Sequence, residues 1–512
     1  MAKTIMLQGT GSHVGKSVLT TALCRIFFQD GYSVAPFKGQ NMALNSYVTV
    51  DGGEMGGAQA IQAEACKIQP DVLMNPVLLK PTQDSASQVI VLGKPMGNLS
   101  AKDYHVQYKD KAWQVIKDSL YKLADNYQVL VIEGAGSPAE VNLKENDVVN
   151  MRVAKEIGAP VLLIADIDRG GALASVVGTL ELLDQEERDL VKGIIINKFR
   201  GDINLLKPAL DFLEAKTGKP VVGVMPYFQG FRIPEEDSIA TENLNTVSTS
   251  QDKLDIAVIH LPYISNFTDF DALTGETDVD LRFVKKGDVL GNPDLIIIPG
   301  SKNTLQDLEY LEKSGLIQEI RDASNINKIP IIGISSGFQV LGSKIIVSEK
   351  NKDLVEYQGL GLLNTETVID AKEITTQVKG KVIVNDGILK NCQNMQLEGY
   401  EIHTGRTTLI GEEGNSPFLL TERSDQEINF LDGAIGQSGQ VFGTHLHGIF
   451  DNDVFRRQVL NNLREAKGWE PLDMPTVNTT LLKEEAYNKL AQVVRENINL
   501  PLLYKVMGLK DE

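Results

Sequence analysis

The feature that most constrains this chain is the stretch between residues 4 and 23. Residues 4–8 form an apolar run typical of a short buried strand, and residues 18–23 have the apolar spacing of a helix. Between them lies the turn Gly-Thr-Gly-Ser-His-Val-Gly-Lys-Ser, residues 9–17. A glycine-rich turn of this kind is typical of a phosphate-binding loop. An ordinary glycine-rich turn is the alternative, and the flanking strand and helix favour phosphate binding.

Each kind of group in this loop has a predicted role. Backbone N–H groups at the start of the helix point at phosphate oxygens, and Lys16 adds a positive charge. The Ser17 hydroxyl can reach a magnesium ion. Five residues rather than four separate Gly9 from Gly15, and we expect the His13 side chain to be solvated. The residues expected to bind nucleotide here are Gly9, Thr10, Gly11, Ser12, His13, Val14, Gly15, Lys16 and Ser17.

Length and composition limit the class of protein. A chain of 512 residues suggests about two or three domains. The net charge is −18 and no basic stripe is visible, so we expect no nucleic-acid partner. The scattered cysteines Cys24, Cys66 and Cys392 suit a reducing compartment. With no room for a signal peptide and no apolar run long enough for a bilayer, a cytoplasmic protein without a membrane partner is expected.

Polar residues follow the apolar strands expected in the first half of the chain. Strands at residues 129–132, 160–165 and 193–196 run into Glu133, Asp166 and Asn197. Strands that alternate with helices predict a doubly wound parallel sheet with its site along the carboxyl edge. We expect Glu133 to face Mg²⁺, because a buried carboxylate without a cation is costly. Asn197 can read an adenine edge, and Asp166 and Asp168 would face the phosphoryl acceptor.

Three further charged residues have two interpretations each. Lys38 ends a predicted strand at residues 32–37, where it can reach phosphate or substrate, or can be an ordinary surface lysine. Asp51 and Glu54 precede a helical stretch and can hold Mg²⁺, or can be acids favoured by the helix dipole. We favour the metal interpretation for one of them, without a choice between the two.

A change of composition predicts the domain boundary. Residues 233–253 are rich in Glu, Asp, Ser, Thr and Asn, and a new alternating pattern follows. We therefore expect a nucleotide-binding domain at residues 1–235, a linker at 236–252, and a second α/β domain at 253–512 that closes with helices. In the second domain a strand at residues 329–332 runs into Gly-Ile-Ser-Ser-Gly at 333–337. Another strand reaches His445 and His447.

Several motifs together resemble the cobyric acid synthase family, and the resemblance runs nearly end to end. The block at residues 40–46 separates this family from its relatives, dethiobiotin synthetase and cobyrinic acid a,c-diamide synthase, which share the phosphate-binding loop with five intervening residues. The motifs that carry the resemblance are residues 9–17, 37–46, 75–82, 133–140, 166–171, 197–202, 265–271 and 399–406.

The resemblance implies a reaction. Members amidate the b, d, e and g carboxylates of adenosylcobyrinic acid a,c-diamide, with ATP and Mg²⁺ in the first domain and glutamine in a C-terminal amidotransferase-like domain. A carboxylate is a poor electrophile, so it is phosphorylated first and ammonia then displaces phosphate. Lys16 and Lys38 are the catalytic residues expected in this half-reaction. The residues expected to contact the corrinoid substrate are Gln40, Asn41, Asn45, Asp166, Asp168 and Arg169.

The chain departs from the family pattern at the second site. Ser335 stands where the family has a nucleophilic cysteine, and His447 stands where the base is expected. No acidic third member is apparent after His447 in the manner of the family, and a serine hydroxyl is scarcely ionised at neutral pH. We therefore expect very weak glutaminase activity or none. Either the serine is an introduced substitution, or this member is supplied with ammonia from solution or by a partner. A serine hydrolase elbow is the alternative interpretation.

Other functions remain open on the sequence alone. The chain can be an ammonia-dependent ligase for another polycarboxylate, or a nucleotide- or corrinoid-binding protein without glutaminase activity. A phosphate-loop ATPase switch is a further rival, whose ATP turnover would not depend on a corrinoid. His403 and Arg406 can contact substrate or shape a turn, and His445 is expected to support His447. The oligomeric state is left open.

Overall fold

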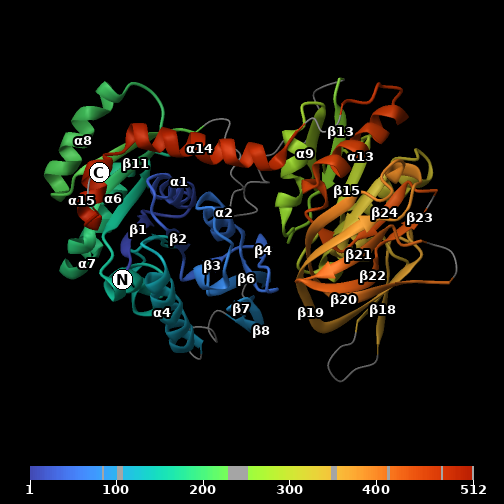
Figure 1. Ribbon diagram of the computed structural model, residues 1–512, viewed down its shortest axis with the longest axis horizontal. Helices are drawn as coiled ribbons and strands as arrows, with labels where there is room; N and C mark the ends of the chain where they lie inside the picture. Colours follow the sequence, from blue (N-terminus) through green and yellow to red (C-terminus); the bar gives the residue numbers. More distant parts are fainter. Residues whose placement is uncertain are drawn as a thin grey trace. The chain divides into compact units, whose positions relative to one another are not determined.

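The computed structural model describes residues 1–83, 86–100, 108–228, 252–347, 354–411, 415–436, 438–473 and 477–509. The chain forms two compact units (Figure 1). Unit 1 comprises Met1–Ala43, Glu54–Glu236 and Lys483–Glu512. Unit 2 comprises Leu44–Gly53 and Asp237–Leu482.

Unit 1 is built on a parallel sheet in the order β12-β11-β10-β1-β9-β2. Its strands are buried along nearly their whole length, as expected when helices cover both faces. The order reverses beside β1, so the carboxyl ends of β1, β9 and β10 form the switch point at which such sheets bind ligands. The strands are β1 (Lys3–Gly9), β2 (Val34–Phe37), β9 (Val129–Glu133), β10 (Val161–Asp166), β11 (Val191–Phe199) and β12 (Val221–Pro226).

The helices of unit 1 include α1, which follows the glycine-rich loop and packs its apolar side on the sheet. The C-terminal helices contribute to the same core, because Tyr487, Leu490 and Leu503 belong to the cluster of buried residues that includes Phe27 of α1. The helices are α1 (Lys16–Gln29), α2 (Gly57–Ala65), α4 (Lys109–Asn126), α5 (Met151–Ile157), α6 (Ala172–Leu182), α7 (Gln185–Leu190), α8 (Ile203–Thr217), α14 (Thr479–Asn497) and α15 (Leu500–Met507).

A smaller sheet in unit 1 has the order β3-β6-β7-β8. Its first pair is parallel and the other pairs are antiparallel. It carries Gln40–Met42, the first part of the sequence block at residues 40–46. The strands are β3 (Gln40–Met42), β6 (Val77–Gln83), β7 (Ala86–Val91) and β8 (Lys94–Ser100), and β5 (Glu54–Gly56) precedes α2.

Unit 2 contains a sheet in the order β14-β13-β15-β16-β24-β23, parallel except for its edge strand β23. Because β16 and β24 are parallel neighbours, the residues that follow them meet at one edge of the sheet. The strands are β13 (Leu254–Ile259), β14 (Val279–Val284), β15 (Leu295–Ile298), β16 (Ile331–Ile334), β23 (Ala434–Gly436) and β24 (Val441–Thr444). The helices are α9 (Asp271–Gly275), α10 (Thr304–Ser314), α11 (Leu316–Asn325), α12 (Ser336–Leu341) and α13 (Asp453–Ala466).

A second, mostly antiparallel sheet completes unit 2. Its path is β18-β17-β19-β20-β25, and β21 joins β19 to β22. The strands are β17 (Lys344–Val347), β18 (Val355–Gln358), β19 (Thr365–Val382), β20 (Gln396–Leu409), β21 (Phe418–Arg423), β22 (Gln426–Asp432) and β25 (Leu446–His447). The short strand β4 (Ser46–Val48) also belongs to unit 2 but is not a strand of this sheet.

The units differ from the expected domains in two places. Leu44–Gly53 was expected in the first domain and belongs to unit 2, whereas Lys483–Glu512 was expected in the second and belongs to unit 1. Both differences come from contacts between residues far apart in sequence, which a change of composition does not reveal. The expected linker lies almost wholly outside the described residues. No described helix is long and apolar enough to cross a membrane.

Candidate active sites

The glycine-rich loop of unit 1 is closed around the Lys16 side chain. Lys16 Nζ donates to Gly11 O at 3.0 Å and to Gly136 O at 3.2 Å, so its ammonium is held where the loop surrounds it. Gly15 adopts φ 97°, and a Cβ there would lie 2.2 Å from Asn197 Nδ2. Only glycine fits this position, which is the last residue before α1 begins at Lys16. The geometry is that of a phosphate-binding loop.

Glu133 is the centre of a buried polar cluster at the carboxyl end of β9. Its Oε1 accepts hydrogen bonds from Ser17 Oγ and from Lys38 Nζ, each at 2.9 Å. Its Oε2 accepts one from Gln62 Nε2 at 2.6 Å. Lys38 is 3% exposed, so it is not the surface lysine that the sequence left possible. Gln62, on α2, is a member of the cluster that sequence reasoning missed.

The oxygen atoms of this cluster fit a magnesium ion. A serine hydroxyl at the start of the helix and a carboxylate at the end of the neighbouring strand are hard oxygen ligands of the kind Mg²⁺ prefers. They already lie within 2.9 Å of one another. No group of three or more His, Cys, Asp or Glu side chains arranged for a metal occurs among the described residues. Any Mg²⁺ here would therefore rely on phosphate and water for its other ligands.

The two other acids expected at the metal lie in different surroundings. Glu54 Oε1 accepts a hydrogen bond from Lys80 Nζ at 2.6 Å, and both side chains are buried. Asp51 belongs to the segment that packs in unit 2, where it bonds to the Thr49 hydroxyl. The structure thus brings Ser17 and Glu133 together, and it gives Glu54 a buried cationic partner.

The residues after β10 and β11 gather at the same edge of the sheet. Asn197 Nδ2 donates to Val14 O at 2.7 Å, which ties the strand end to the loop. Its buried Oδ1 has no hydrogen-bond partner among the described residues, so an acceptor is available for a donor such as an adenine amino group. Asp166 lies 3.0 Å from Lys198 Nζ and 3.9 Å from Arg169 Nε. Asp168 pairs with the guanidinium of Arg200 at 2.9 Å.

The residues of the 40–46 block do not share one place. Gln40 and Asn41 lie on β3 in unit 1, where Asn41 Nδ2 donates to Gln59 Oε1 at 3.1 Å. Asn45 lies in unit 2, where its Oδ1 accepts a hydrogen bond from the backbone N–H of Phe267 at 3.1 Å. Their expected contacts with substrate stay predictions.

Ser335 occupies a sharp turn between β16 and α12. Its backbone has φ 53° and ψ −113°, a strained conformation for a residue with a side chain. A Cβ on Gly337 would lie 2.0 Å from Ile298 O, and one on Gly333 would lie 2.8 Å from Gly337 O. Both glycines of the Gly-x-Ser-x-Gly motif are therefore needed, because neighbouring backbone lies too close to leave room for a side chain, as in a nucleophile elbow.

His447 stands beside this elbow. A Cβ on Gly300 would lie 3.4 Å from Ser335 Cβ and 3.5 Å from His447 Nε2, so both side chains border the same point. The hydroxyl of Ser335 donates its one proton to Ile402 O at 3.2 Å. The imidazole of His447 stacks on Tyr400 with centroids 5.2 Å apart.

The acidic partner of His447 is Asp269. Asp269 Oδ2 lies 2.7 Å from His447 Nδ1, and Oδ1 accepts from the backbone N–H of Gly448 at 2.9 Å. A carboxylate on Nδ1 fixes the imidazole and leaves Nε2 toward the nucleophile. The sequence downstream of His447 gives no sign of this acid, because Asp269 precedes His447 in the chain. The sequence did contain a sign that Asp269 is functional, since it lies in the motif at residues 265–271.

A buried histidine pair lies on the strands next to His447. The rings of His403 and His445 stack with centroids 3.8 Å apart, and His445 Nε2 lies 3.1 Å from Thr407 Oγ1. Burial, together with the charge of His403, lowers the pKa of His445 well below its usual value. A neutral His445 fits the expected supporting role. Arg406 is exposed on β20.

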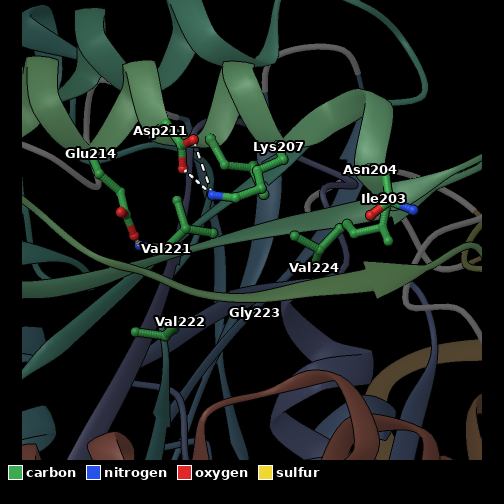
Figure 2. A pocket seen from close by; sticks show the side chains of 10 residues that line it. Ile203, Asn204, Lys207, Asp211, Glu214, Val221, Val222, Gly223 and Val224 are labelled. Atoms are coloured by element: carbon green, nitrogen blue, oxygen red, sulfur yellow. Dashed lines mark hydrogen bonds and ion pairs between the residues drawn. The ribbon is translucent and has the colours of Figure 1, made fainter.

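A groove of about 350 Å³ lies between α8 and β12, and Figure 2 shows the side chains that line it. Lys207 and Asp211 form an ion pair across one helical turn, and Glu214 accepts a hydrogen bond from Val221 N. None of the residues predicted from the sequence to form a site lines this groove. It contributes nothing to the two sites described above.

The comparisons with known proteins agree with this geometry. Residues 5–239 match the CobQ/CobB/MinD/ParA nucleotide binding domain, and residues 255–455 match the CobB/CobQ-like glutamine amidotransferase domain. This chain is 54% identical to a cobyric acid synthase of Desulfitobacterium hafniense, and the match covers 99% of this chain and 98% of that relative. The chain belongs to the cobyric acid synthase family. The cobyric acid synthase of Pelotomaculum thermopropionicum is 52% identical, and the match covers 99% of this chain and 97% of that relative. The cobyric acid synthase of Moorella thermoacetica is 51% identical, and the match covers 100% of this chain and 98% of that relative.

Membership of the cobyric acid synthase family confirms two predictions. The fold class is an α/β nucleotide-binding domain with a parallel sheet, followed by an α/β glutamine amidotransferase-like domain. The enzyme class is an ATP-dependent amide ligase that carries a glutamine amidotransferase domain.

Proposed function

We propose that this chain uses ATP and Mg²⁺ to amidate the b, d, e and g carboxylates of adenosylcobyrinic acid a,c-diamide, giving adenosylcobyric acid. The observation that carries the proposal is the cluster of Ser17 and Lys38 around Glu133, next to the glycine-rich loop that holds Lys16. The names of the relatives, at about half identity over nearly the whole chain, support the corrinoid substrate.

The chemistry needs an activated carboxylate. Transfer of the γ-phosphoryl group to a carboxylate oxygen gives an acyl phosphate and ADP. Ammonia then adds to the carbonyl carbon and phosphate leaves, which gives the amide. Lys16 would stabilise the charge that spreads over the transferred phosphoryl oxygens, and Lys38 adds a second ammonium at the same strand ends. Ser17 and Glu133 would hold Mg²⁺, which neutralises phosphate charge when bound.

We propose further that glutamine is a poor nitrogen source for this chain. Asp269 and His447 supply a base, but the nucleophile is the Ser335 hydroxyl, whose proton is directed at Ile402 O. A hydroxyl is far less ionised than a thiol at neutral pH, so a base suited to cysteine activates it weakly. Free ammonium would then serve the synthetase reaction directly.

The test is to incubate purified protein with the a,c-diamide, ATP, Mg²⁺ and ammonium, and to follow both corrinoid mass and ADP formation. Successive exchange of carboxyl for amide, with one ADP formed per amide, supports the proposal. ATP turnover that is independent of the corrinoid, with no change of corrinoid mass, would contradict it and favour an ATPase switch.

A further inference from the structure

The segment Leu44–Gly53, here called the inserted segment, lies between two parts of unit 1 in sequence but packs in unit 2. It pairs there with the loop that carries Asp269. The backbone N–H of Phe267 donates to Asn45 Oδ1 at 3.1 Å, and the backbone N–H of Ser46 donates to Asn266 Oδ1 at 2.9 Å. The two bonds are reciprocal and buried, and together we call them the asparagine clasp.

The clasp lies next to the base of the glutaminase site. Asn266 O accepts a hydrogen bond from the backbone N–H of Asp269 at 3.0 Å, and Asp269 Oδ2 contacts His447 Nδ1 at 2.7 Å. Asn266 has φ 52°, in the left-handed region that costs energy unless neighbours hold it. The clasp supplies such neighbours on both sides of this residue.

The inserted segment is itself anchored in unit 2. Gln377 Nε2 donates to Val48 O at 2.8 Å. A Cβ on Gly52 would lie 3.1 Å from Thr375 O, so the segment's turn runs close against β19. Asn45, Ser46 and Asp269 are each at most 5% exposed. The segment is therefore a packed part of unit 2, able to transmit its position to the loop.

We propose that Asn45 is a positioning residue of the glutaminase site, acting through Phe267 and Asp269 on His447. The inference rests on the proposal that unit 2 carries a glutaminase site whose activity is weakened by Ser335. A loop freed from the clasp would let the Asp269 carboxylate shift, and His447 would no longer be fixed against residue 335. Small displacements of a catalytic group cost large factors in rate, so kcat would fall while glutamine affinity would not. The N-terminal half of the sequence would thus supply part of the amidotransferase site.

The test uses the Ser335→Cys variant, which carries the nucleophile of the family. In that background Asn45→Ala is expected to lower kcat for glutamine hydrolysis about 10- to 100-fold, with KM unchanged. It is also expected to slow iodoacetamide alkylation of the introduced thiol, mapped by mass spectrometry against the three buried natural cysteines. Asn45→Asp, which keeps the accepting oxygen, is expected to restore both rates.

A second variant and a control complete the design. Ser46→Pro removes the N–H that Asn266 accepts, and it is expected to act in the same direction even where Asn45→Ala does not fold. Asn462→Ala removes buried hydrogen bonds of similar kind to Ile388 O and Lys390 O, and it is expected to leave alkylation unchanged.

The outcomes separate the two proposals. Absence of glutaminase activity in the Ser335→Cys parent contradicts the proposed function of unit 2. An active parent with equally active Asn45→Ala and Ser46→Pro derivatives overturns the positioning role. The positioning role is also overturned if Asn45→Ala lowers the rates of hydrolysis and alkylation and a folded Asn45→Asp variant does not restore them, because the accepting oxygen is then irrelevant. An equal loss in Asn462→Ala would show a general effect of destabilisation and would also count against the clasp.

Discussion

Asp269 Oδ2 lies 2.7 Å from His447 Nδ1, although 178 positions separate the two residues in sequence. The contact joins the 3₁₀ turn at Phe267–Phe270, after β13, to β25, and both elements lie in unit 2. It turns a histidine beside a serine elbow into a complete nucleophile, base and acid arrangement. The proposed loss of glutaminase activity would therefore come from residue 335 and not from the residues that support it.

Replacing Asp269 by Asn tests this relationship. In the Ser335→Cys background, Asp269→Asn is expected to lower glutamine hydrolysis by roughly 10²- to 10⁴-fold, because the amide no longer fixes the imidazole as the carboxylate does. Ammonium-dependent amidation measured on the same sample is expected to persist. Asp271→Asn, two residues away on α9, is the matched control. Unchanged hydrolysis in Asp269→Asn would mean that His447 works without this acid.

Glu133 carries the corresponding prediction for unit 1. Glu133→Gln removes the negative charge shared by Ser17 and Lys38, and amidation with ammonium is expected to fall about 100-fold or more. The measurement is the initial rate of amide formation at saturating ATP. Glu140→Gln, an acid of the neighbouring loop, is the control and should retain activity. A fully active Glu133→Gln enzyme would remove this residue from the proposed magnesium site.

The buried pair of Glu54 and Lys80 is expected to stabilise unit 1. Glu54→Gln leaves the Lys80 ammonium buried beside a neutral amide, which is expected to lower the free energy of unfolding by about 3–5 kcal/mol. The double variant Glu54→Gln/Lys80→Met removes both charges, and its free energy of unfolding is expected to fall by less than that of Glu54→Gln. Denaturant unfolding of unit 1 measures both effects. Equal stability of wild type and Glu54→Gln, with a weaker response to Mg²⁺, would instead make Glu54 a metal ligand.

Asp307 on α10 predicts a pH dependence of unit 2. Burial raises its pKa to about 8, while Ser301 Oγ donates to its Oδ1 at 2.9 Å. The folded state therefore binds a proton that the unfolded state releases near pH 4, so stability falls as pH rises from there to about 8. Asp307→Asn, which imitates the protonated acid, should flatten this decline in unfolding midpoints measured between pH 5 and pH 8. Glu309 is exposed on the same helix, and Glu309→Gln should leave the decline unchanged. A parallel decline in Asp307→Asn and wild type would contradict the assignment.

Local patterns were sufficient to predict much of this structure. The loop at residues 9–17 and the strand that ends at Glu133 are continuous in sequence, and their chemistry follows from neighbouring residues. Their convergence follows from the rule that parallel strands share a carboxyl edge, which is why Lys16, Ser17 and Glu133 were expected together. The elbow at Ser335 was visible for the same reason.

Long-range placements were not available from those patterns. Asp269 acts on His447 from an earlier loop, and Asn45 packs in unit 2 although its neighbours Gln40 and Asn41 lie in unit 1. Tyr487 of α14 joins the core around α1 from the far end of the chain. Each case depends on which surfaces pack together, and neither periodicity nor composition specifies that choice.

The central claim is that the ligase half of this chain is intact and that Ser335 limits its use of glutamine. The most direct measurement compares corrinoid amidation by the chain with Ser335 and by its Ser335→Cys variant, each supplied with ATP and either ammonium or glutamine. Both proteins are expected to use ammonium equally, and only Ser335→Cys is expected to use glutamine efficiently. Efficient amidation from glutamine by the chain with Ser335, or no amidation from ammonium by either protein, would contradict the proposed function.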